Sequence, residues 1–384
     1  MKYYIVAGEA SGDLHGSNLM KGLYKEDPKA CIRFWGGPLM DAVYKEHEEG
    51  EGLVEDYRAG AVMGVVEVLR KAPQLLGRIN RCKADIAAWK PDVVILIDYP
   101  GFNFKVAEFA HNAGFKVYYY IAPKVWATRE GRVKKLKAWV DKLFIVFPFE
   151  KPFFDRHGVP YVYAGNPLVD AIENSPALKE SRESFLARTG LPDRPMIALL
   201  AGSRSMEIGA MMPIFMELAD TWHAKHPEYQ FVVAAAPSRS EKDYDAYLAG
   251  RHEYVKTVFG ETYGAIRHAR AAVINSGTAS LEAALIGTPQ VVGYKVNALT
   301  ALIARFAIKV KYISLGNLIL DRLAFRELLQ ESLTVPALMA ELERLSSDEA
   351  CREKMQADYA EIRSLLGGSG ASEAVARAMI ESLS

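Results

Sequence analysis

Cysteine is scarce in this sequence, and the scarcity bears on where the protein works. The 384 residues include three cysteines, Cys31, Cys82 and Cys351, which form no C-x-x-C pair and have no histidine cluster beside them. We therefore expect a reducing compartment and neither a disulfide framework nor a structural zinc site.

Long apolar runs and an excess of charge are also missing. No window holds 18 uncharged apolar residues, so we expect no transmembrane helix. Met1–Val6 meets Gly8-Glu9 too soon to be a secretory signal, which favours a cytoplasmic location. The 47 Lys and Arg residues balance 47 Asp and Glu residues, and no nucleic-acid module is recognisable, so nucleic acid is not an expected partner.

Short apolar runs alternate with stretches of helical spacing, which predicts an α/β fold with parallel sheets. The expected strands are Tyr3–Ala7, Val93–Ile97, Val117–Ile121, Leu143–Phe147, Tyr161–Ala164, Ile197–Leu200, Phe231–Ala235, Ala271–Ile274 and Gln290–Tyr294. The expected helices include about 16–23, Val68–Trp89 interrupted at Pro73, Phe104–Asn112, Ser181–Arg188, about 206–223 and Leu281–Ile286.

The length fits two domains of ordinary size. We expect a Rossmann-like domain at 1–173, a linker region at 174–195, and a second Rossmann-like domain at 196–366. Gly367-Gly368-Ser369-Gly370 then sets off a last helix within 367–384, which we expect to pack on the first domain.

Three strand–glycine–helix junctions stand out as candidate binding loops. They contain Ser11-Gly12-Asp13, Gly202-Ser203-Arg204 and Ser276-Gly277-Thr278. A helix start of this kind presents unpaired amides and a positive dipole end to an anion, although the same residues are also ordinary turn and cap formers. No Lys follows the glycine as in an ATP loop, and the first junction lacks G-x-G-x-x-G, so a sugar nucleotide with a diphosphate leaving group fits better than ATP or a dinucleotide.

Three charged side chains are candidate site residues: Arg204 and Glu282 at two of these junctions, and Asp98 after another apolar run. Asp98 ends an apolar run and is a candidate general base, or else a cap of the next helix. Arg204 is a candidate contact for the leaving diphosphate. Glu282, near the start of the third helix, is a candidate acceptor for ribose hydroxyls.

Basic residues interleave with apolar ones in Val62–Lys83, Lys124–Lys142 and Leu299–Tyr312. This pattern favours an anionic lipid surface as a partner. The alternative for each segment is an amphipathic helix with a solvated basic face.

Six motifs occur in order and together resemble the lipid-A-disaccharide synthase family from the first strand to about residue 330. They are Gly8-Glu9-Ala10-Ser11-Gly12-Asp13, Ile97-Asp98-Tyr99-Pro100, Ala122-Pro123-Lys124-Val125-Trp126-Ala127, Phe147-Pro148-Phe149-Glu150, Gly202-Ser203-Arg204 and Ser276-Gly277-Thr278-Ala279-Ser280-Leu281-Glu282. The resemblance implies a GT-B fold, in which two Rossmann-like domains face their parallel sheets across a cleft. The first domain would face acceptor and membrane, and the second would bind the UDP-sugar.

The resemblance also implies an inverting transfer in lipid A biosynthesis that needs no metal or cofactor. UDP-2,3-diacylglucosamine would be the donor and 2,3-diacylglucosamine 1-phosphate the acceptor, giving a β-1,6-linked lipid A disaccharide 1-phosphate and UDP. The setting would be the cytoplasmic face of the inner membrane, with peripheral attachment to its anionic surface. No oligomeric state follows from the sequence.

The resemblance implies roles for individual residues of this chain. Asp98 would be the general base and Arg204 the contact to the diphosphate, and a larger set of residues would make further contacts to the substrate. That set is Ser11, Gly12, Asp13, Gly202, Ser203, Gly277, Thr278, Glu282 and Asn317. The chain departs from the family at Gly316 (often Pro), Thr128 (often Trp) and Asn166 (often His), and lacks an acidic residue near Leu323. Two rival functions stay open: a sugar-nucleotide epimerase on the same scaffold, and a non-catalytic nucleotide-binding membrane protein.

Overall fold

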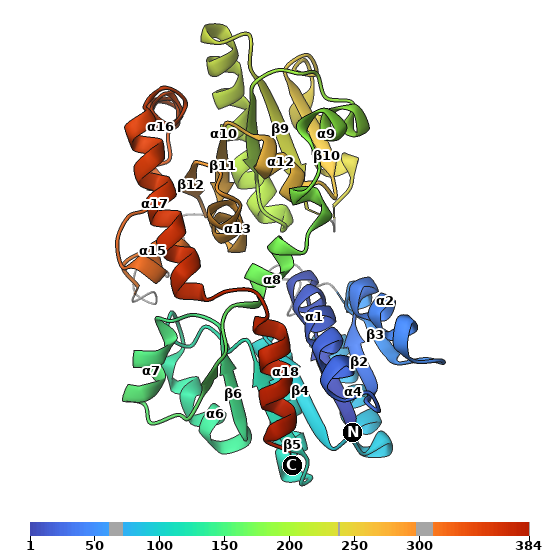
Figure 1. The fold of residues 1–384 in the computed structure, drawn as a ribbon. Coiled ribbons are helices and arrows are strands. Elements are labelled where there is room, and N and C mark those ends of the chain that lie inside the picture. The colour runs from blue at the N-terminus through green and yellow to red at the C-terminus, as the bar shows by residue number, and fades with distance from the viewer. Residues whose placement is uncertain (61–71, 237–238, 297–309, 384) are drawn as a thin grey trace. The chain divides into compact units, whose positions relative to one another are not determined.

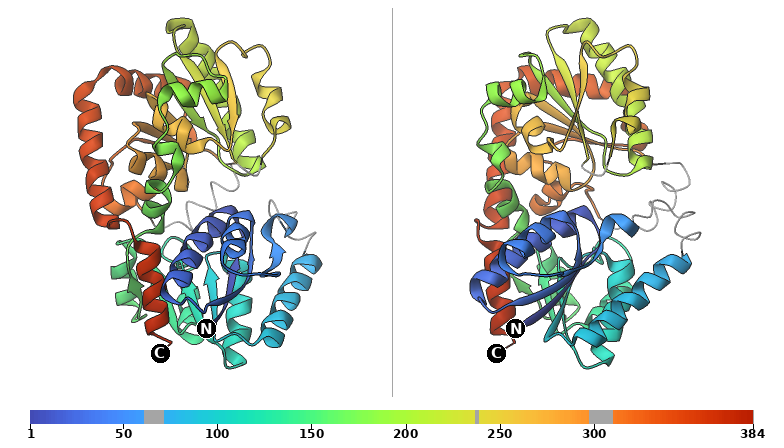
Figure 2. Two further views of the ribbon diagram at one scale, coloured as in Figure 1. Left: turned by 45° about the vertical axis from the view of Figure 1, so that its right-hand side comes forward. Right: turned by 90° about the vertical axis from the view of Figure 1, so that its right-hand side faces the viewer.

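The computed structural model describes residues 1–60, 72–236, 239–296 and 310–383 (Figure 1). The chain forms two compact units, Met1–Ala171 with Leu366–Ser384, and Ile172–Leu365. Each unit is a parallel sheet with helices on both faces (Figure 2), which confirms the predicted fold class. Among the described residues, no helix is long and apolar enough to cross a membrane.

Unit 1 contains a seven-stranded sheet in the order β3-β2-β1-β4-β5-β6-β7. Its strands are β1 (Lys2–Ala7), β2 (Cys31–Gly36), β3 (Leu53–Asp56), β4 (Val93–Ile97), β5 (Lys116–Tyr120), β6 (Lys142–Ile145) and β7 (Val162–Tyr163). Alternate residues of β1 serve two cores: Tyr4 and Val6 face one cluster, while Tyr3 and Ile5 face the other. Burial on both faces explains why the central strands are continuous apolar runs.

Helices on the two faces of unit 1 complete those cores. They are α1 (Ala10–Glu26), α2 (Pro38–His47), η1 (Tyr57–Gly60), α4 (Ala72–Trp89), α5 (Pro100–Asn112), η2 (Glu130–Arg132), α6 (Val133–Trp139), α7 (Glu150–Arg156), α8 (Pro167–Glu173, which runs into unit 2) and α18 (Ala371–Glu381). The C-terminal helix α18 lies along α1, where Lys25 Nζ is 2.7 Å from Glu373 Oε2. Val375, Ala376 and Met379 of α18 belong to the unit 1 core.

Unit 2 contains a six-stranded sheet in the order β10-β9-β8-β11-β12-β13. The strands are β8 (Met196–Leu200), β9 (Gln230–Ala235), β10 (Val255–Phe259), β11 (Ala271–Asn275), β12 (Gln290–Tyr294) and β13 (Glu327–Leu329). The helices are η3 (Pro176–Leu178), α9 (Arg182–Thr189), α10 (Ser205–Lys225), η4 (Glu241–Asp243), α11 (Asp245–Leu248), α12 (Thr262–His268), α13 (Thr278–Ile286), α15 (Leu315–Leu320), η5 (Gln330–Ser332), α16 (Val335–Ser347) and α17 (Glu349–Leu366).

Some local expectations need correction. Helix α1 begins at Ala10 rather than near residue 16, so Ser11, Gly12 and Asp13 lie in its first turn and not in a loop. Within the described residues α4 begins at Ala72, so Pro73 stands in a first turn, where its missing N–H costs nothing. The segment expected as a linker, 174–195, lies in unit 2, because α9 buries Phe185 in that unit's core.

Candidate functional site

Each sheet has one point where the strand order reverses direction, and the predicted motifs flank it. In unit 1 the point lies between β1 and β4, and in unit 2 between β8 and β11. Ligands of open α/β sheets bind outside the carboxyl ends of the strands at such points. The loops concerned lead from Ala7, Ile97, Leu200 and Asn275.

Asp98 follows β4 directly and has an unusual backbone. Its φ is +41°, and that of Tyr99 is +45°, in the left-handed region that non-glycine residues seldom adopt. Side chains hold this turn: Asn103 Nδ2 donates to the Asp98 carbonyl at 2.9 Å and to the Ile97 carbonyl at 3.1 Å, and Tyr119 Oη donates to the Asp98 carbonyl at 2.6 Å. Backbone strain held by the surrounding structure is typical of functional turns.

A further strained residue lies at the next strand end, and the loop after β1 packs closely against the Asp98 turn. Ile121, directly after β5, has φ of +60° although it is β-branched. Gly8, directly after β1, packs under the Tyr99 ring so closely that a Cβ there would overlap the ring. The loops after β1 and β4 are therefore in direct contact at the reversal point of unit 1.

Of the first predicted loop, Ser11 is exposed and Gly12 is buried against β1. Asp13 is only 2% exposed and accepts three backbone amides: Gly37 at 2.9 Å, Leu39 at 3.1 Å and Met40 at 3.0 Å. Burial raises the pKa of Asp13, and these amide bonds oppose that rise. Asp13 thus caps helix α2, a structural role that the sequence did not reveal.

In unit 2, the loop Gly202-Ser203-Arg204 leads from β8 into α10. Gly202 has φ of +100°, and a Cβ there would overlap the Glu207 carboxylate. Glu207 Oε2 accepts the amides of Ser203 at 3.0 Å and Arg204 at 3.1 Å, which is a capping arrangement. The amides expected to face a phosphate are therefore occupied by a carboxylate. The Arg204 side chain remains 59% exposed while its Nη1 lies 3.2 Å from Glu207 Oε1.

The third loop, after β11, differs because no side chain among the described residues caps its helix. Gly277 is the N-cap residue of α13 and makes no side-chain hydrogen bond, and Gly277 and Thr278 are both exposed. The first amides of an uncapped helix are suited to an anionic group. Of the two helix starts at the unit 2 reversal point, α13 is thus the better prepared for a phosphate.

Glu282 lies one turn into α13 rather than at its very start. It falls on the same face as Thr278, four residues earlier. The carboxylate accepts the Tyr263 hydroxyl at 2.9 Å, and burial raises the pKa of Glu282. Sequence reasoning identified Glu282 but missed Tyr263, because nothing in the spacing of the two residues signals their contact.

Asn317 is fully buried, and its amide group organises the loop before β13. Its Nδ2 donates to Phe325 O at 3.0 Å and to Glu327 Oε1 at 2.8 Å, and its Oδ1 accepts the Ala324 amide at 2.8 Å. These hydrogen bonds stabilise the loop before β13. Glu327 also accepts the Ser314 amide at 2.9 Å, so a carboxylate is present four residues beyond Leu323.

The other departures from the family also have local explanations. Asn166 is 2% exposed and bridges the Val146 carbonyl and the Leu168 amide, each at 2.9 Å. A Cβ on Gly316 would come within 2.9 Å of the Phe325 ring. Thr128 is exposed.

Glu150 is a buried acid that the sequence reasoning assigned to a motif without a role. It is 1% exposed and accepts the amides of Val146 at 3.0 Å and Phe147 at 2.9 Å, and the Trp126 indole at 3.1 Å. Burial raises the pKa of Glu150 to about 7. It ties the loops after β5 and β6 together, next to the strand that bears Asp98.

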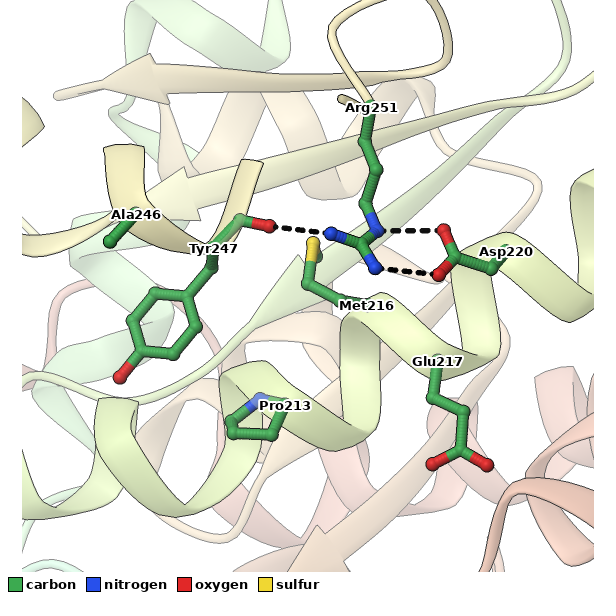
Figure 3. Close-up of a pocket in the computed structure, with 7 residues that line it drawn as sticks. All are labelled: Pro213, Met216, Glu217, Asp220, Ala246, Tyr247 and Arg251. Carbon is green, nitrogen blue, oxygen red and sulfur yellow. Dashed lines mark hydrogen bonds and ion pairs between the residues drawn. The ribbon is translucent and has the colours of Figure 1, made fainter. Parts of the chain in front are cut away.

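A shallow pocket of about 350 Å³ lies elsewhere in unit 2, beside α10 and α11 (Figure 3). Arg251 forms a bidentate salt bridge with Asp220 there, with both hydrogen bonds at 2.7 Å, and also donates to the Tyr247 carbonyl at 3.1 Å. These groups satisfy one another, and none of the predicted site residues lines the pocket. The reversal point of each unit, taken by itself, is the better candidate for a binding site.

Comparison with solved structures defines the fold further. A UDP-GlcNAc 2-epimerase from Neisseria meningitidis, bound to UDP-GlcNAc, superposes with a TM-score of 0.71 at 16% identity, covering 99% of this chain and all of that chain. The calicheamicin glycosyltransferase CalG4 superposes with a TM-score of 0.58 at 14% identity, covering 100% and 97%. At these identities the likeness speaks for a shared GT-B fold and not for a shared reaction.

Sequence comparison is more specific. The lipid-A-disaccharide synthetase family model matches residues 3–380. The lipid-A-disaccharide synthase of Geobacter metallireducens is 40% identical over 380 residues, covering 99% of this chain and 96% of the relative. That of Pseudomonas fluorescens is 38% identical over 347 residues, covering 90% and 89%. The chain therefore belongs to the lipid-A-disaccharide synthase family and is a glycosyltransferase of GT-B fold.

Proposed function

We propose that the protein condenses UDP-2,3-diacylglucosamine with 2,3-diacylglucosamine 1-phosphate to a β-1,6-linked disaccharide 1-phosphate and UDP. Family membership supports this reaction. The observation that carries the site is the position of the predicted residues at the reversal points of both sheets, Asp98 in unit 1 and Arg204 with Gly277 in unit 2. Unit 1 would bind the acceptor and unit 2 the donor.

In the proposed step, a hydroxyl oxygen of the acceptor attacks the anomeric carbon of the donor sugar. The carbon–oxygen bond to the diphosphate breaks on the opposite face, so the configuration inverts. Asp98 takes the hydroxyl proton. A positioned base of this kind typically contributes about 100-fold or more to the rate, and the side-chain bonds that hold the Asp98 turn support such positioning.

The electron pair of the broken bond stays with UDP, whose diphosphate gains charge. The exposed Arg204 guanidinium and the uncapped start of α13 supply positive charge for it. Each such contact is typically worth about 3 kcal/mol in the transition state. Ser203 would contribute less, since its amide already binds Glu207.

One assay, run with and without acceptor, separates this function from its rivals. Purified protein receives donor and acceptor together, and the products are analysed for UDP and disaccharide. A glycosyltransferase forms both in equal amounts and neither when the acceptor is omitted. An epimerase would alter the donor sugar without any acceptor, and a non-catalytic protein would leave both substrates unchanged. Addition of EDTA is expected to leave the rate as it was.

We also propose peripheral binding to an anionic membrane surface through unit 1. Helix α6 exposes Lys134, Lys135 and Lys137 and buries Val133 and Leu136 in the core. Its apolar face is thus already covered, so this helix would attract lipid by charge alone. The apolar surface expected at 63–76 lies mostly outside the described residues; in its described part, Leu76 is 58% exposed.

Liposome flotation tests this membrane proposal. Of the basic residues expected to bind lipid near α4, Arg78 pairs with Glu55, so its replacement would disturb the fold. The better variant replaces Lys134, Lys135 and Lys137 by Ser. Reduced flotation with phosphatidylglycerol vesicles at low salt is expected, with unchanged behaviour on neutral vesicles. Flotation equal to that of the unmodified protein would contradict a role for α6.

A further inference from the structure

Tyr263 and Glu282 form a hydrogen-bonded polar pair in unit 2. The Tyr263 hydroxyl donates to Glu282 Oε1 at 2.9 Å, and both side chains are partly buried. Tyr263 is the second residue of α12, which follows β10, and Glu282 belongs to α13, which follows β11. The two helices pack against each other, so the pair lies between the helix starts at the carboxyl end of the sheet.

The hydrogen bond leaves the carboxylate only half satisfied. In the described part of the chain Glu282 makes this one side-chain hydrogen bond, through Oε1. Burial raises the pKa of Glu282, and the bond from Tyr263 acts against that rise. Tyr263 thus favours the ionised carboxylate and fixes its rotation, with the second oxygen ready to accept from another donor.

The surroundings indicate where that donor would come from. Thr278, one turn before Glu282 on the same face of α13, is exposed at the uncapped helix start. Glu282 lies about one helical turn, or about 5 Å along the axis, from this helix start. If a diphosphate binds at the helix start, its nucleoside would therefore lie near the carboxylate. The neutral hydroxyls of a ribose are donors that a carboxylate accepts without repulsion.

We infer that Tyr263 is a positioning residue that orients the Glu282 carboxylate toward the 2′ and 3′ hydroxyls of the donor's ribose. This inference rests on the proposed placement of the UDP-sugar at α13. In this role Tyr263 would help the site to distinguish a ribose from other sugars that are attached to a diphosphate. A carboxylate free to rotate would lose part of this discrimination, because its hydrogen-bond geometry would no longer be fixed in advance.

The test measures binding of UDP and of 2′,3′-dideoxyuridine diphosphate to the full-length protein by calorimetry. We expect the unmodified protein to prefer UDP by at least about 10-fold, as expected for a site whose polar group is left unpaired by the analogue. Tyr263→Phe removes one oxygen. It is expected to weaken UDP binding severalfold and to leave binding of the dideoxy analogue unchanged, so that the preference falls.

Further variants test the assigned role of Tyr263. Glu282→Ala should abolish the preference, and adding Tyr263→Phe to it should cause no further change, since the tyrosine acts only through the carboxylate. Tyr247→Phe, a matched change in the same unit beside the pocket of Figure 3, should leave the preference intact. If Tyr263→Phe does not fold, Glu282→Asp breaks the same pair from the other side and should show the same loss.

The outcomes distinguish this inference from the function on which it rests. A full preference in folded Tyr263→Phe, together with its loss in Glu282→Ala, would overturn the positioning role and leave the proposed function standing. A full preference in Glu282→Ala, or no binding of UDP to the unmodified protein, would instead refute the donor site itself.

Discussion

The Tyr99 ring covers the α-carbon of Gly8 and leaves no room for a Cβ. Because Tyr99 follows Asp98 directly, this contact between the loops after β1 and β4 also fixes the turn that carries the proposed base. The positive φ at both residues of the turn shows how narrowly its conformation is determined.

Gly8→Ala should therefore displace Tyr99 and with it Asp98. We expect kcat to fall by at least about 10-fold, since small misplacements of a reacting group are costly, while circular dichroism stays that of a folded protein. Gly101→Ala is the matched control, because a Cβ at Gly101 would meet open space. Equal kcat values for the two variants would show that the contact has no catalytic consequence.

Asp13→Ala should destabilise the protein without weakening UDP binding. The change removes the carboxylate that accepts three backbone amides at the start of α2, which should cost about 2 kcal/mol of unfolding free energy. Urea unfolding measures the loss, and calorimetry measures UDP binding. Asp41→Ala, which removes only the ion pair with Lys45 on the same helix, is the control. A large fall in UDP affinity with little change in stability would instead support a role for Asp13 in binding UDP.

Glu207→Ala should loosen the loop that carries Arg204. The amides of Ser203 and Arg204, just before α10, lose their acceptor, which should cost about 1 kcal/mol of stability, and the KM for the donor should rise because the guanidinium is less well placed. Glu217→Ala, on an exposed position of the same helix, should change neither quantity. Tighter donor binding by Glu207→Ala would instead mean that the carboxylate competes with the diphosphate for these amides.

Glu150 should make stability depend on pH. Its pKa is raised to about 7 in the folded state, so the folded protein holds the proton more tightly than the unfolded chain. Stability should accordingly fall as pH rises from about 4.5 to about 7 and change little from this source above that, by about 2 kcal/mol between pH 5 and pH 8.

Glu150→Gln cannot ionise and should lack this component of the pH dependence. Unfolding by urea at pH 5 and pH 8 gives the difference between variant and unmodified protein. Glu108→Gln, on a side chain that is 41% exposed in the same unit, should follow the unmodified protein. Parallel pH profiles for all three proteins would count against a proton on Glu150 in the folded state.

Strands made wholly of apolar residues are predicted from the sequence, whereas strands that are interrupted by a charge or are very short are missed. Strand β4 is buried on both faces and is recognisable from its five apolar residues. Strand β2 was not predicted, because Arg33 interrupts it; that charge is accommodated by a bidentate pair with Asp85, both bonds at 2.8 Å. The three-residue β13 is too short to have a periodicity.

The candidate site was likewise predicted from the sequence only in part. Glycine turns and charges after apolar runs indicated candidate binding loops at the ends of strands. Which polar groups are already occupied depends on residues distant in sequence, such as the amides from α2 that bind Asp13 and the Tyr263 hydroxyl that binds Glu282. Periodicity carries no information on such contacts, so only the folded structure separates capping carboxylates from available ones.

The central claim is that Asp98 of unit 1 acts on a sugar whose diphosphate is bound by unit 2. The most direct test is the turnover of Asp98→Ala with donor and acceptor, measured as UDP released, beside its affinity for UDP. Asp92→Ala, an exposed position just before the other end of β4, is the control. We predict a loss of kcat of at least about 100-fold with UDP affinity within twofold of the unmodified protein; a folded Asp98→Ala variant with near-normal turnover would contradict the account.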